Sequence, residues 1–487
     1  MNDERVPADI SANDWAATPV VVRAVVLDLQ MTVAQLTQRV AELAEQVHQT
    51  SQNSSKPPST DPPNAPPRPK HTPSGRKAGA QPGHAGHTRA LKPASQVKQF
   101  IDLKPTSCAQ CGALLLGDDP APERRQVTEL PPIQPEVSEY RRHALTCLVC
   151  QHATEAAWPS DMPSGSFGPR LQGTVGYLAG RSGASHRDVE EVMDTLFHTN
   201  VSLGSVAALE QDVSAALEQP VAAAQTYVHA QPAVNADETS WRQGTMRHWL
   251  WLAATPWVAI FQVLATRGTQ GAKQLLGATY RGIVGSDRWV GYNWIATICR
   301  QQCWAHLRRD FQAMVDRGGE SARIGQALLA QTHQLFDLWH RVRDGTLSRA
   351  DFQTALQPIR AQVHDLLQEG ATLVLAKTSA TCANILKLEP ALWTFVTVEG
   401  VEPTNNDAER PLRRAVLWRR RSFGTQSANG SQFVERILTT VTTLRLQHRN
   451  VLDYLTAACE AKMRGGTAPS LLPDQAALAA VIMESTA

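Results

Sequence analysis

Residues 231–265 read QPAVNADETSWRQGTMRHWLWLAATPWVAIFQVLA, and this stretch decides the fold. QPAVNAD predicts a short strand that ends at Asp237. HWLWLAA and WVAIFQVLA predict two further strands, joined by a turn at Pro256 into an antiparallel hairpin. Downstream, QGAKQLLGA (270–278) is typical of a helix, and YRGIVGSD (280–287) is typical of a buried strand that ends at Asp287. ICRQQCWAHLRRDF (298–311) predicts another strand that enters a helix.

This order of strands and helices favours an α/β domain of the ribonuclease-H-like type. In such mixed sheets functional side chains gather at strand ends, so Asp237 and Asp287 are expected on neighbouring strands. A third acid, Glu409, lies in TNNDAERPLRR (404–414), which predicts a helix that begins near Asn405 or Asn406. Glu409 would then face the two aspartates from the first helical turn.

Three converging carboxylates suit phosphodiester chemistry, in which two metal ions hold the attacking and leaving oxygens. Oxygen ligands favour Mg²⁺ or Mn²⁺ over zinc. We therefore predict that Asp237, Asp287 and Glu409 are catalytic and bind these ions. Glu409 is alternatively a first-turn acid that complements the helix dipole. Asp407 and Glu238 are the substitutes if one of the three acids is misassigned.

Length and charge point to several units and a polyanionic partner. The 487 residues are enough for three or four domains, and the net charge of +2 is unevenly placed. Residues 56–98 hold eight Lys or Arg and one acid, and residues 404–449 hold nine Arg and three acids. Clustered cations suit nucleic acid, although a solvated basic surface is the alternative. No apolar run is long enough to span a membrane, and residues 1–15 do not resemble a signal peptide. We therefore expect a cytoplasmic, nucleoid-associated protein with reduced thiols.

The N-terminal part predicts a helix and a linker. In residues 21–49, Val recurs every seven residues from Val26 and Leu fills the alternate heptad position from Leu29. This pattern predicts a parallel two-stranded coiled coil, and hence a homodimer or higher oligomer. A single amphipathic helix is the alternative. Residues 50–98 form a Pro- and Gly-rich basic linker. Its segment GRKAGAQPGHAGHTR supplies candidate DNA-binding residues, unless its charges are incidental: Arg76, Lys77, His84, His87 and Arg89.

Two CxxC pairs predict a zinc ribbon over residues 99–160. Each pair places two thiolates on one tight turn, and two such turns complete a tetrahedral structural Zn²⁺ site. EVSEYRRHALTC (136–147) is interpreted as a strand that leads into the second pair. Redox-active thiols are the alternative. The four candidate ligands are Cys108, Cys111, Cys147 and Cys150.

The remaining segments are predicted to be mainly helical. Residues 165–225 contain two short helices, capped by Ser185 and Ser205, which fit either a DNA-binding helix-turn-helix or a plain helical bridge. The α/β domain spans residues 230–450 with a helical insertion at about 312–400, and residues 451–487 form a C-terminal helical tail. Arginines that follow Glu409, with the loop SFGTQSANGS (422–431), are expected to hold DNA strands beside the metals: Arg410, Arg413, Arg414, Arg419, Arg420 and Arg421.

Taken in order, these motifs resemble the insertion sequence 66 family of transposases over nearly the whole chain. The likeness is carried by the heptad helix, NSSKPPSTD, GRKAGAQPGHAGH, the paired CxxC motifs, DETSW, SDRWVGY, CWAHLRRDF, NNDAERPLR and SFGTQSANGS. The resemblance implies a DDE-type recombinase with Asp237, Asp287 and Glu409 as its acids and Mg²⁺ as its cofactor. It also implies terminal inverted repeats and target DNA as double-stranded substrates, and separately encoded accessory proteins. His306 and Arg308 fall in the segment that matches CWAH and are further candidates for DNA contact.

The residues leave two other functions open. A ribonuclease-H-like nuclease that cuts without joining would share the three acids. A non-catalytic, zinc-containing DNA-binding regulator would share the heptad helix, the cysteine pairs and the basic segments.

Overall fold

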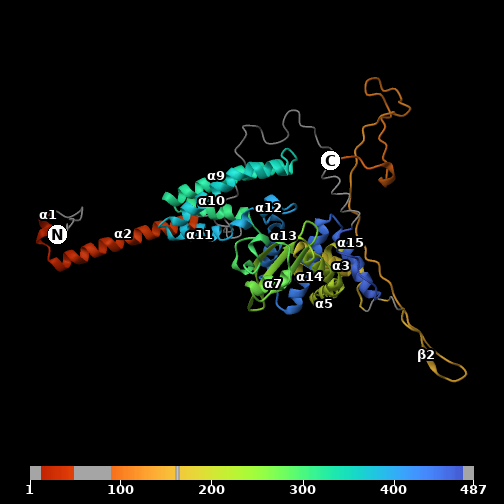
Figure 1. Cartoon of the computed structure of the whole chain (residues 1–487). Helices are drawn as coiled ribbons and strands as arrows, with labels where there is room; N and C mark the ends of the chain where they lie inside the picture. The colour runs from red at the N-terminus through yellow and green to blue at the C-terminus, as the bar shows by residue number, and fades with distance from the viewer. Residues whose placement is uncertain (1–11, 49–88, 160–161, 163–164, 475–487) are drawn as a thin grey trace. The chain divides into compact units, whose positions relative to one another are not determined.

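The computed structural model describes residues 12–48, 89–159, 162 and 165–474 (Figure 1). The chain divides into two compact units, which are described separately. One comprises residues 1–66, 141–190 and 201–487, and the other residues 67–140 and 191–200. Most of the predicted linker, including Arg76, Lys77, His84 and His87, lies outside the described residues, as does the end of the predicted tail. Within the described ranges, no helix has the length and apolar character needed to cross a membrane.

A five-stranded mixed sheet forms the centre of the larger unit. Its order is β5-β4-β3-β6-β7; β3, β4 and β5 are antiparallel, and β6 and β7 run parallel to β3. The predicted hairpin and both later strands are confirmed. The bounds are β3 Ala233–Gln243, β4 Met246–Ala254, β5 Ala259–Leu264, β6 Ile283–Ser286 and β7 Arg300–Gln302.

The structure corrects one detail of the predicted sheet. The strand that contains Asp237 does not end there, because β3 continues to Gln243 and pairs with β4 across a turn at Gly244, whose φ of 57° suits glycine. Asp237 is therefore mid-strand, opposite Leu252. The predicted helix after β5 is confirmed as α7 (Thr269–Leu276). Between β6 and β7 the chain makes two 3₁₀ turns, η3 (Val290–Tyr292) and η4 (Thr297–Cys299).

Alternate side chains of the strands enter cores on opposite faces of the sheet, as the period of two requires. Trp251 and Ala253 pack in one core with α3 (Pro169–Ser182), α5 (Leu203–Ala216) and α15 (Val451–Met463). Leu250 and Leu252 pack in another with α13 (Asn406–Ser422) and α14 (Ala428–Leu446).

Helix α14 also covers the edge of β5 that has no neighbouring strand. The backbone N–H groups of Ala259, Phe261 and Val263 donate to Thr443 Oγ1, Thr439 Oγ1 and Glu435 Oε1 at 3.1, 3.0 and 2.7 Å. These acceptors recur every four residues on α14 and therefore lie on one helix face. An edge strand whose donors are satisfied in this way cannot pair with another sheet.

The helices before the sheet share its core and do not form a separate bundle. Buried side chains of α3, α5 and α6 (Glu218–His229) lie in the same core as β3 and β4. Ser185 caps α4 (His186–Phe197) as predicted, because its Oγ accepts from Asp188 N at 3.2 Å. The next helix is capped by Ser202, not by Ser205. A DNA-binding role for this segment stays a prediction.

The predicted helical insertion is present. Its buried side chains form a separate core together with those of α8 (Trp304–Asp316). It comprises α9 Gly319–Arg343, α10 Arg349–Thr372, α11 Ala376–Leu386, η5 Glu389–Leu392 and α12 Thr394–Thr397. Within the predicted C-terminal helical tail, α15 packs against α3. Near the N-terminus, α1 (Ala12–Ala17) precedes α2 (Val20–His48), which confirms the heptad segment as a helix. Val25, Leu29 and Val33 of α2 are exposed.

The cysteine-containing segment has little regular structure. A 3₁₀ turn, η2 (Ala94–Gln96), precedes the first pair, and the second pair lies between β1 (Ala144–Thr146) and β2 (Ala153–Glu155). The predicted strand into Cys147 is therefore correct only for its last residues, since residues 136–143 form no strand.

Candidate active site

Three elements place the predicted acids near one another beside the C-terminal end of β6, although ligand atoms of all three do not lie within 4.8 Å of one another. Asp237 projects from β3, Asp287 directly follows β6, and Glu409 lies in the first turn of α13. Burial, and then the negative charges of Glu238, Asp287 and Glu409, raise the pKa of Asp237 well above its usual value. All three predicted acids thus lie within electrostatic reach of one another.

Backbone hydrogen bonds orient the two aspartates. Glu238 N donates to Asp237 Oδ1 at 2.8 Å, and Trp289 N donates to Asp287 Oδ1 at 2.9 Å. Each of these bonds engages one carboxylate oxygen. The chemistry of this donor set, several hard oxygens with mutual repulsion, fits a divalent cation such as Mg²⁺.

The residue before α13 attaches that helix to the sheet. Asn405 is the N-cap residue, but its side chain makes no capping hydrogen bond. Instead, its Nδ2 donates to Ala236 O at 2.8 Å, and its backbone N donates to Cys303 Sγ at 3.1 Å. These bonds fix the first turn of α13, and hence Glu409, beside the residue that precedes Asp237.

Glu409 is also surrounded by residues of the CWAH segment. Its Oε1 lies 3.9 Å from Cys303 Sγ, 3.3 Å from His306 Nδ1 and 3.7 Å from Arg309. The His306 nitrogen is close to the carboxylate but not aligned for a hydrogen bond. Burial, and then the charge of Arg309, lower the pKa of His306. Burial, and then Glu409, raise the pKa of Cys303 to about 12.

Potential ligand atoms of Cys303, His306 and Glu409 lie within 4.8 Å of one another. The sequence interpretation missed Cys303 here. The signal was available, because a CxxH spacing at the start of a helix places both side chains on one turn. Arg308, two residues after His306, is exposed.

The two substitute acids differ from the predicted three. Glu238 follows Asp237 in β3 and therefore points to the opposite face of the sheet. There its carboxylate accepts from Arg267 Nε at 2.9 Å and from the Tyr292 hydroxyl at 3.0 Å. Burial, and then Asp287, raise the pKa of Glu238. Glu238 is thus held by two side chains on that face. Asp407 is half-buried in the first turn of α13.

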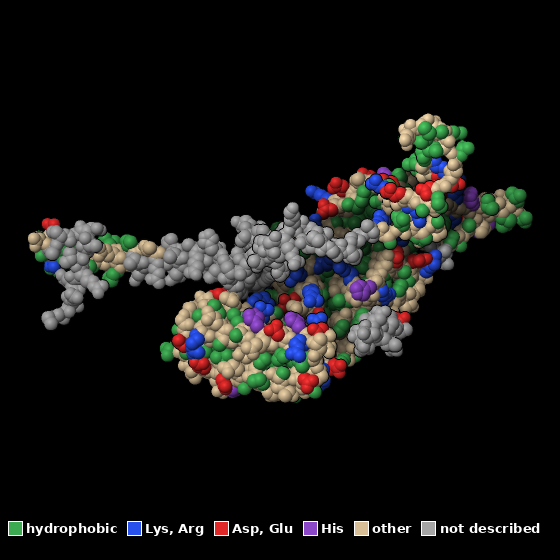
Figure 2. Space-filling model, turned by 90° about the horizontal axis from the view of Figure 1, so that it is seen from above, with side chains coloured by type: hydrophobic (Ala, Val, Ile, Leu, Met, Phe, Trp, Pro, Cys, Tyr) green, Lys and Arg blue, Asp and Glu red, His purple; other side chains and the backbone are tan. Residues whose placement is uncertain are grey.

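The arginines of α13 fall into two groups. Three are engaged with protein: Arg414 donates to Arg181 O, Arg419 donates to Thr239 Oγ1 and Ser240 O at 2.9 and 2.6 Å, and Arg421 lies 3.6 Å from Asp188. Arg410 and Arg413 are exposed, and Arg420 is exposed but also interacts with the protein. Over the face shown in Figure 2, basic and acidic side chains are intermingled, so the local arrangement matters more than the total charge.

Each cysteine pair forms a tight turn by itself. Gly112 N donates to Cys108 O and Gln151 N donates to Cys147 O, both at 2.9 Å. Backbone N–H groups, first that of Cys111 and then that of Gln110, lower the pKa of the Cys108 thiol. The N–H groups of Cys150 and Val149 do the same for Cys147. Such donors stabilise thiolates, the form that binds zinc. The two turns belong to different units.

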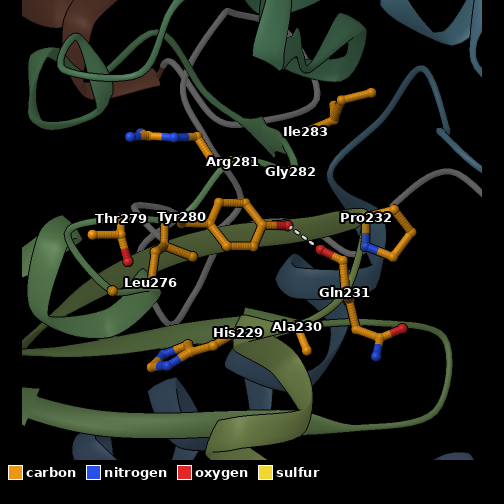
Figure 3. A pocket seen from close by; sticks show the side chains of 11 residues that line it. His229, Ala230, Gln231, Pro232, Leu276, Thr279, Tyr280, Arg281, Gly282 and Ile283 are labelled. Atoms are coloured by element: carbon orange, nitrogen blue, oxygen red, sulfur yellow. Dashed lines mark hydrogen bonds between the residues drawn. The ribbon is translucent and has the colours of Figure 1, made fainter.

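A cavity of about 630 Å³ lies away from the acids (Figure 3). It is lined by residues 229–232, 276–277 and 279–283, which precede β3 and β6. Because β3 and β6 are parallel, this is the end of β6 opposite to Asp287. The Tyr280 hydroxyl donates to Gln231 O at 2.9 Å across it. Its lining residues include no carboxylate, so we assign it no part in the metal chemistry.

Comparison with known proteins matches three parts of the chain. Residues 165–433 match the family described as transposase IS66 family, and residues 105–151 match the zinc-finger binding domain of transposase IS66. Residues 11–90 match a family of unknown function. Two uncharacterized proteins of Sinorhizobium fredii, y4hP and y4qI, are 25% and 26% identical over 70% and 44% of this chain. The aligned parts span 68% and 43% of those proteins.

Proposed function

The chain belongs to the IS66 family of transposases, and on that premise we propose that it cuts and rejoins DNA with divalent metal ions held by Asp237, Asp287 and Glu409. The observation that carries the proposal is the proximity of these carboxylates, which come from β3, the end of β6 and α13. Burial is the main cause of the raised pKa of Asp237, and the charges of Asp287 and Glu409 add to it. Acids that gather at one place, with a buried member whose pKa is raised, are candidates for a functional site. The sheet order further supports a ribonuclease-H-like domain as the scaffold.

Bound Mg²⁺ or Mn²⁺ would neutralise charge on the attacking and leaving oxygens of the phosphodiester. The chain's residues do the rest. Asn405 and Cys303 hold Glu409 in place, and the exposed arginines of α13 neutralise the phosphates of the bound strand. Cleavage would leave a 3′ hydroxyl that attacks target DNA in the same site. A covalent protein–DNA intermediate is not needed.

The other segments would recognise and pair the DNA ends. The family match supports a zinc-binding region, and we assign its ligands to Cys108, Cys111, Cys147 and Cys150. This region, with the basic residues of 75–89, would bind terminal inverted repeats. The exposed apolar residues of α2 would pair two copies of the chain as a coiled coil, so that two ends meet in one complex. Accessory proteins of the same element are further proposed partners.

Asp287→Asn tests the catalytic assignment. In the zinc-loaded full chain, we expect cleavage of end-containing DNA to fall roughly 10³-fold or more, because one metal ligand is lost while the shape is kept. Asp407→Asn is the matched control, since it changes an acid in the same turn as Glu409 without touching the three proposed ligands. Unchanged cleavage by Asp287→Asn, with an unchanged circular dichroism spectrum, would refute the assignment.

The same assay separates the two alternative functions. A nuclease without joining activity would cut the DNA but give no strand-transfer products when the cleaved ends are mixed with plasmid. A non-catalytic regulator would bind without added metal and would not cut at all.

A further inference from the structure

The residue that ends α13 has an unusual conformation for its type. Phe423 is the C-cap residue, with φ 60° and ψ 11° in the left-handed region, and its N–H donates to Arg419 O at 2.8 Å. Glycine, or less often asparagine, is the usual residue at such a position, because a side chain there is strained. A phenylalanine held in this conformation therefore suggests a use for its side chain.

The side chain of Phe423 is exposed to solvent. Its exposed fraction is 77%, whereas every other Phe, Tyr and Trp within residues 165–474 is buried or half-buried. Burying an aromatic ring is among the largest apolar contributions that a side chain makes to stability. Phe423 makes no such contribution to this fold, so its ring is available to a ligand.

The loop after Phe423 is firmly attached to the β3–β4 hairpin. Thr425 N donates to Arg242 O at 2.9 Å, and Gly244 N donates to Thr425 O at 2.7 Å. The Thr425 hydroxyl lies 2.7 Å from Ser431 Oγ and accepts from Trp241 Nε1 at 3.3 Å. Gly424, with φ 115°, passes directly against the backbone of Arg242. Phe423 is thus presented on a fixed support.

Positive charge surrounds this support. Arg242 and Arg247 are exposed and lie directly opposite each other in the β3–β4 register. Like charges placed opposite each other destabilise a hairpin, so the pair favours an anionic ligand. No carboxylate of residues 165–474 forms an ion pair with either arginine. Arg420, three residues before Phe423, is also exposed.

We propose that Phe423 stacks on a base of the bound DNA strand, while Arg242 and Arg247 contact the phosphates beside it. This inference rests on the proposed function and adds a second point at which the strand is held. Every base has an aromatic face, so such stacking is independent of sequence, and it is strongest where bases are unpaired.

The structure also predicts where on the strand Phe423 acts. Helix α13 runs beside β3. Arg419 of the helix donates hydrogen bonds to Thr239 and Ser240, and the loop after the helix bonds to the backbone of Arg242. The five residue-to-residue steps from Asp237 to Arg242 span about 17 Å of strand. With phosphates spaced about 3.4 Å apart along DNA, this distance corresponds to about five nucleotides from the cleaved bond.

The test compares Phe423→Ala and Phe423→Trp with Leu417→Ala in the full chain. Leu417 is a matched control, because it is also apolar and 58% exposed on α13. The probes are a mixed-sequence single-stranded oligonucleotide and the same sequence as a blunt duplex, titrated by fluorescence anisotropy. We expect Phe423→Ala to weaken single-strand binding about 5- to 100-fold and duplex binding less. Phe423→Trp and Leu417→Ala should bind as the wild type does.

Phe423→Gly separates stacking from stability. Glycine adopts the left-handed conformation without strain, so this variant should unfold at a urea concentration no lower than the wild type and still bind single strands as poorly as Phe423→Ala. Equal affinities of the wild type and Phe423→Ala for the single strand would overturn the stacking proposal alone. A change in molecular mass on light scattering with unchanged DNA affinity would assign Phe423 to a protein contact and also overturn it. Failure of the wild type to bind either probe would overturn the proposed function as well.

Discussion

Residues 101–159 and residues 165–474 are stabilised in different ways. In the first segment every side chain is exposed except those of Cys108 and Gln126, which are half-buried, and the only strands are β1 and β2. Leu148 and Val149, within the second cysteine pair, are 91% and 94% exposed. The second segment buries three clusters of apolar side chains around its sheet and helices.

The difference indicates what each region needs from a metal ion. Fixing a residue's backbone costs about 1–2 kcal/mol, and apolar burial is the main term that offsets this cost. Residues 101–159 bury almost nothing, so they require a cross-link, and four thiolates around zinc would supply it. Residues 165–474 have their cores and would need Mg²⁺ only for chemistry. Loss of zinc and loss of magnesium should therefore affect different properties.

Replacing one zinc ligand should have the largest effect. We expect Cys147→Ser to abolish the folding of residues 101–155, because structural zinc contributes about 10–16 kcal/mol to small domains of this kind. Hydrogen exchange on the full chain should show lost protection there and unchanged protection in β3, β4 and α14. Zinc content, measured by atomic emission, should fall in parallel. Cys299→Ser, at a half-buried cysteine of the larger segment, is the control. Equal protection in both variants would remove the contrast between the two regions.

The elements of the sheet could be predicted because their apolar periodicity is local. The local pattern predicts too short a strand at Asp237, because it does not extend through polar residues such as Thr239 and Ser240. They continue it because β4 supplies backbone partners, which no local pattern encodes. The role of Asn405 as a tie to β3 was likewise hidden, since its sequence context favours an ordinary helix cap.

Contacts between distant parts of the chain are also missing from the sequence interpretation of the candidate active site. Local motifs single out Asp237, Asp287 and Glu409 as candidates, but the approach of Cys303 to Glu409 depends on how α8 and α13 pack. That α3 and α15, which are far apart in sequence, pack against each other also depends on tertiary structure. An amphipathic pattern states that a face is buried but not which element buries it.

The buried carboxyl group of Asp237, in residues 165–474, allows the second test. Folding raises the pKa of Asp237, so its carboxyl favours the folded state while protonated, and this contribution disappears as pH rises through the folded pKa. In the presence of EDTA at pH 7, Asp237→Asn should therefore be more stable than the wild type by roughly 1–2 kcal/mol. The difference should narrow as the pH falls towards about 4, the usual value for an aspartate. Urea midpoints followed by tryptophan fluorescence measure both trends.

The control variant should change the folding stability in the opposite direction. Asp310 is paired with Arg288, whose guanidinium lies 2.6 Å away, so Asp310→Asn should lower stability where Asp237→Asn raises it. If Asp237→Asn is destabilising in EDTA at every pH, the acids do not repel one another as the structure indicates. The larger region would then also depend on metal for its folding, and the contrast with residues 101–159 would weaken.

Two arginines of α13 separate residues that bind DNA from residues that stabilise the fold. The expected changes in affinity and stability are the smallest of the three tests. Arg413 is exposed, whereas Arg419 donates to Thr239 and Ser240 of β3. Arg413→Gln should leave the urea midpoint unchanged and lower the slope of log affinity against log salt by about 1, because one phosphate contact is lost. Arg419→Gln should lower stability by about 1 kcal/mol, because hydrogen bonds to β3 are lost, and should leave the salt slope unchanged. Anisotropy titrations over a salt series, paired with urea unfolding, distinguish the two. A reduced slope for Arg419→Gln at unchanged stability would instead make Arg419 a DNA ligand, and the hydrogen bonds to β3 would then belong to the DNA-free state alone.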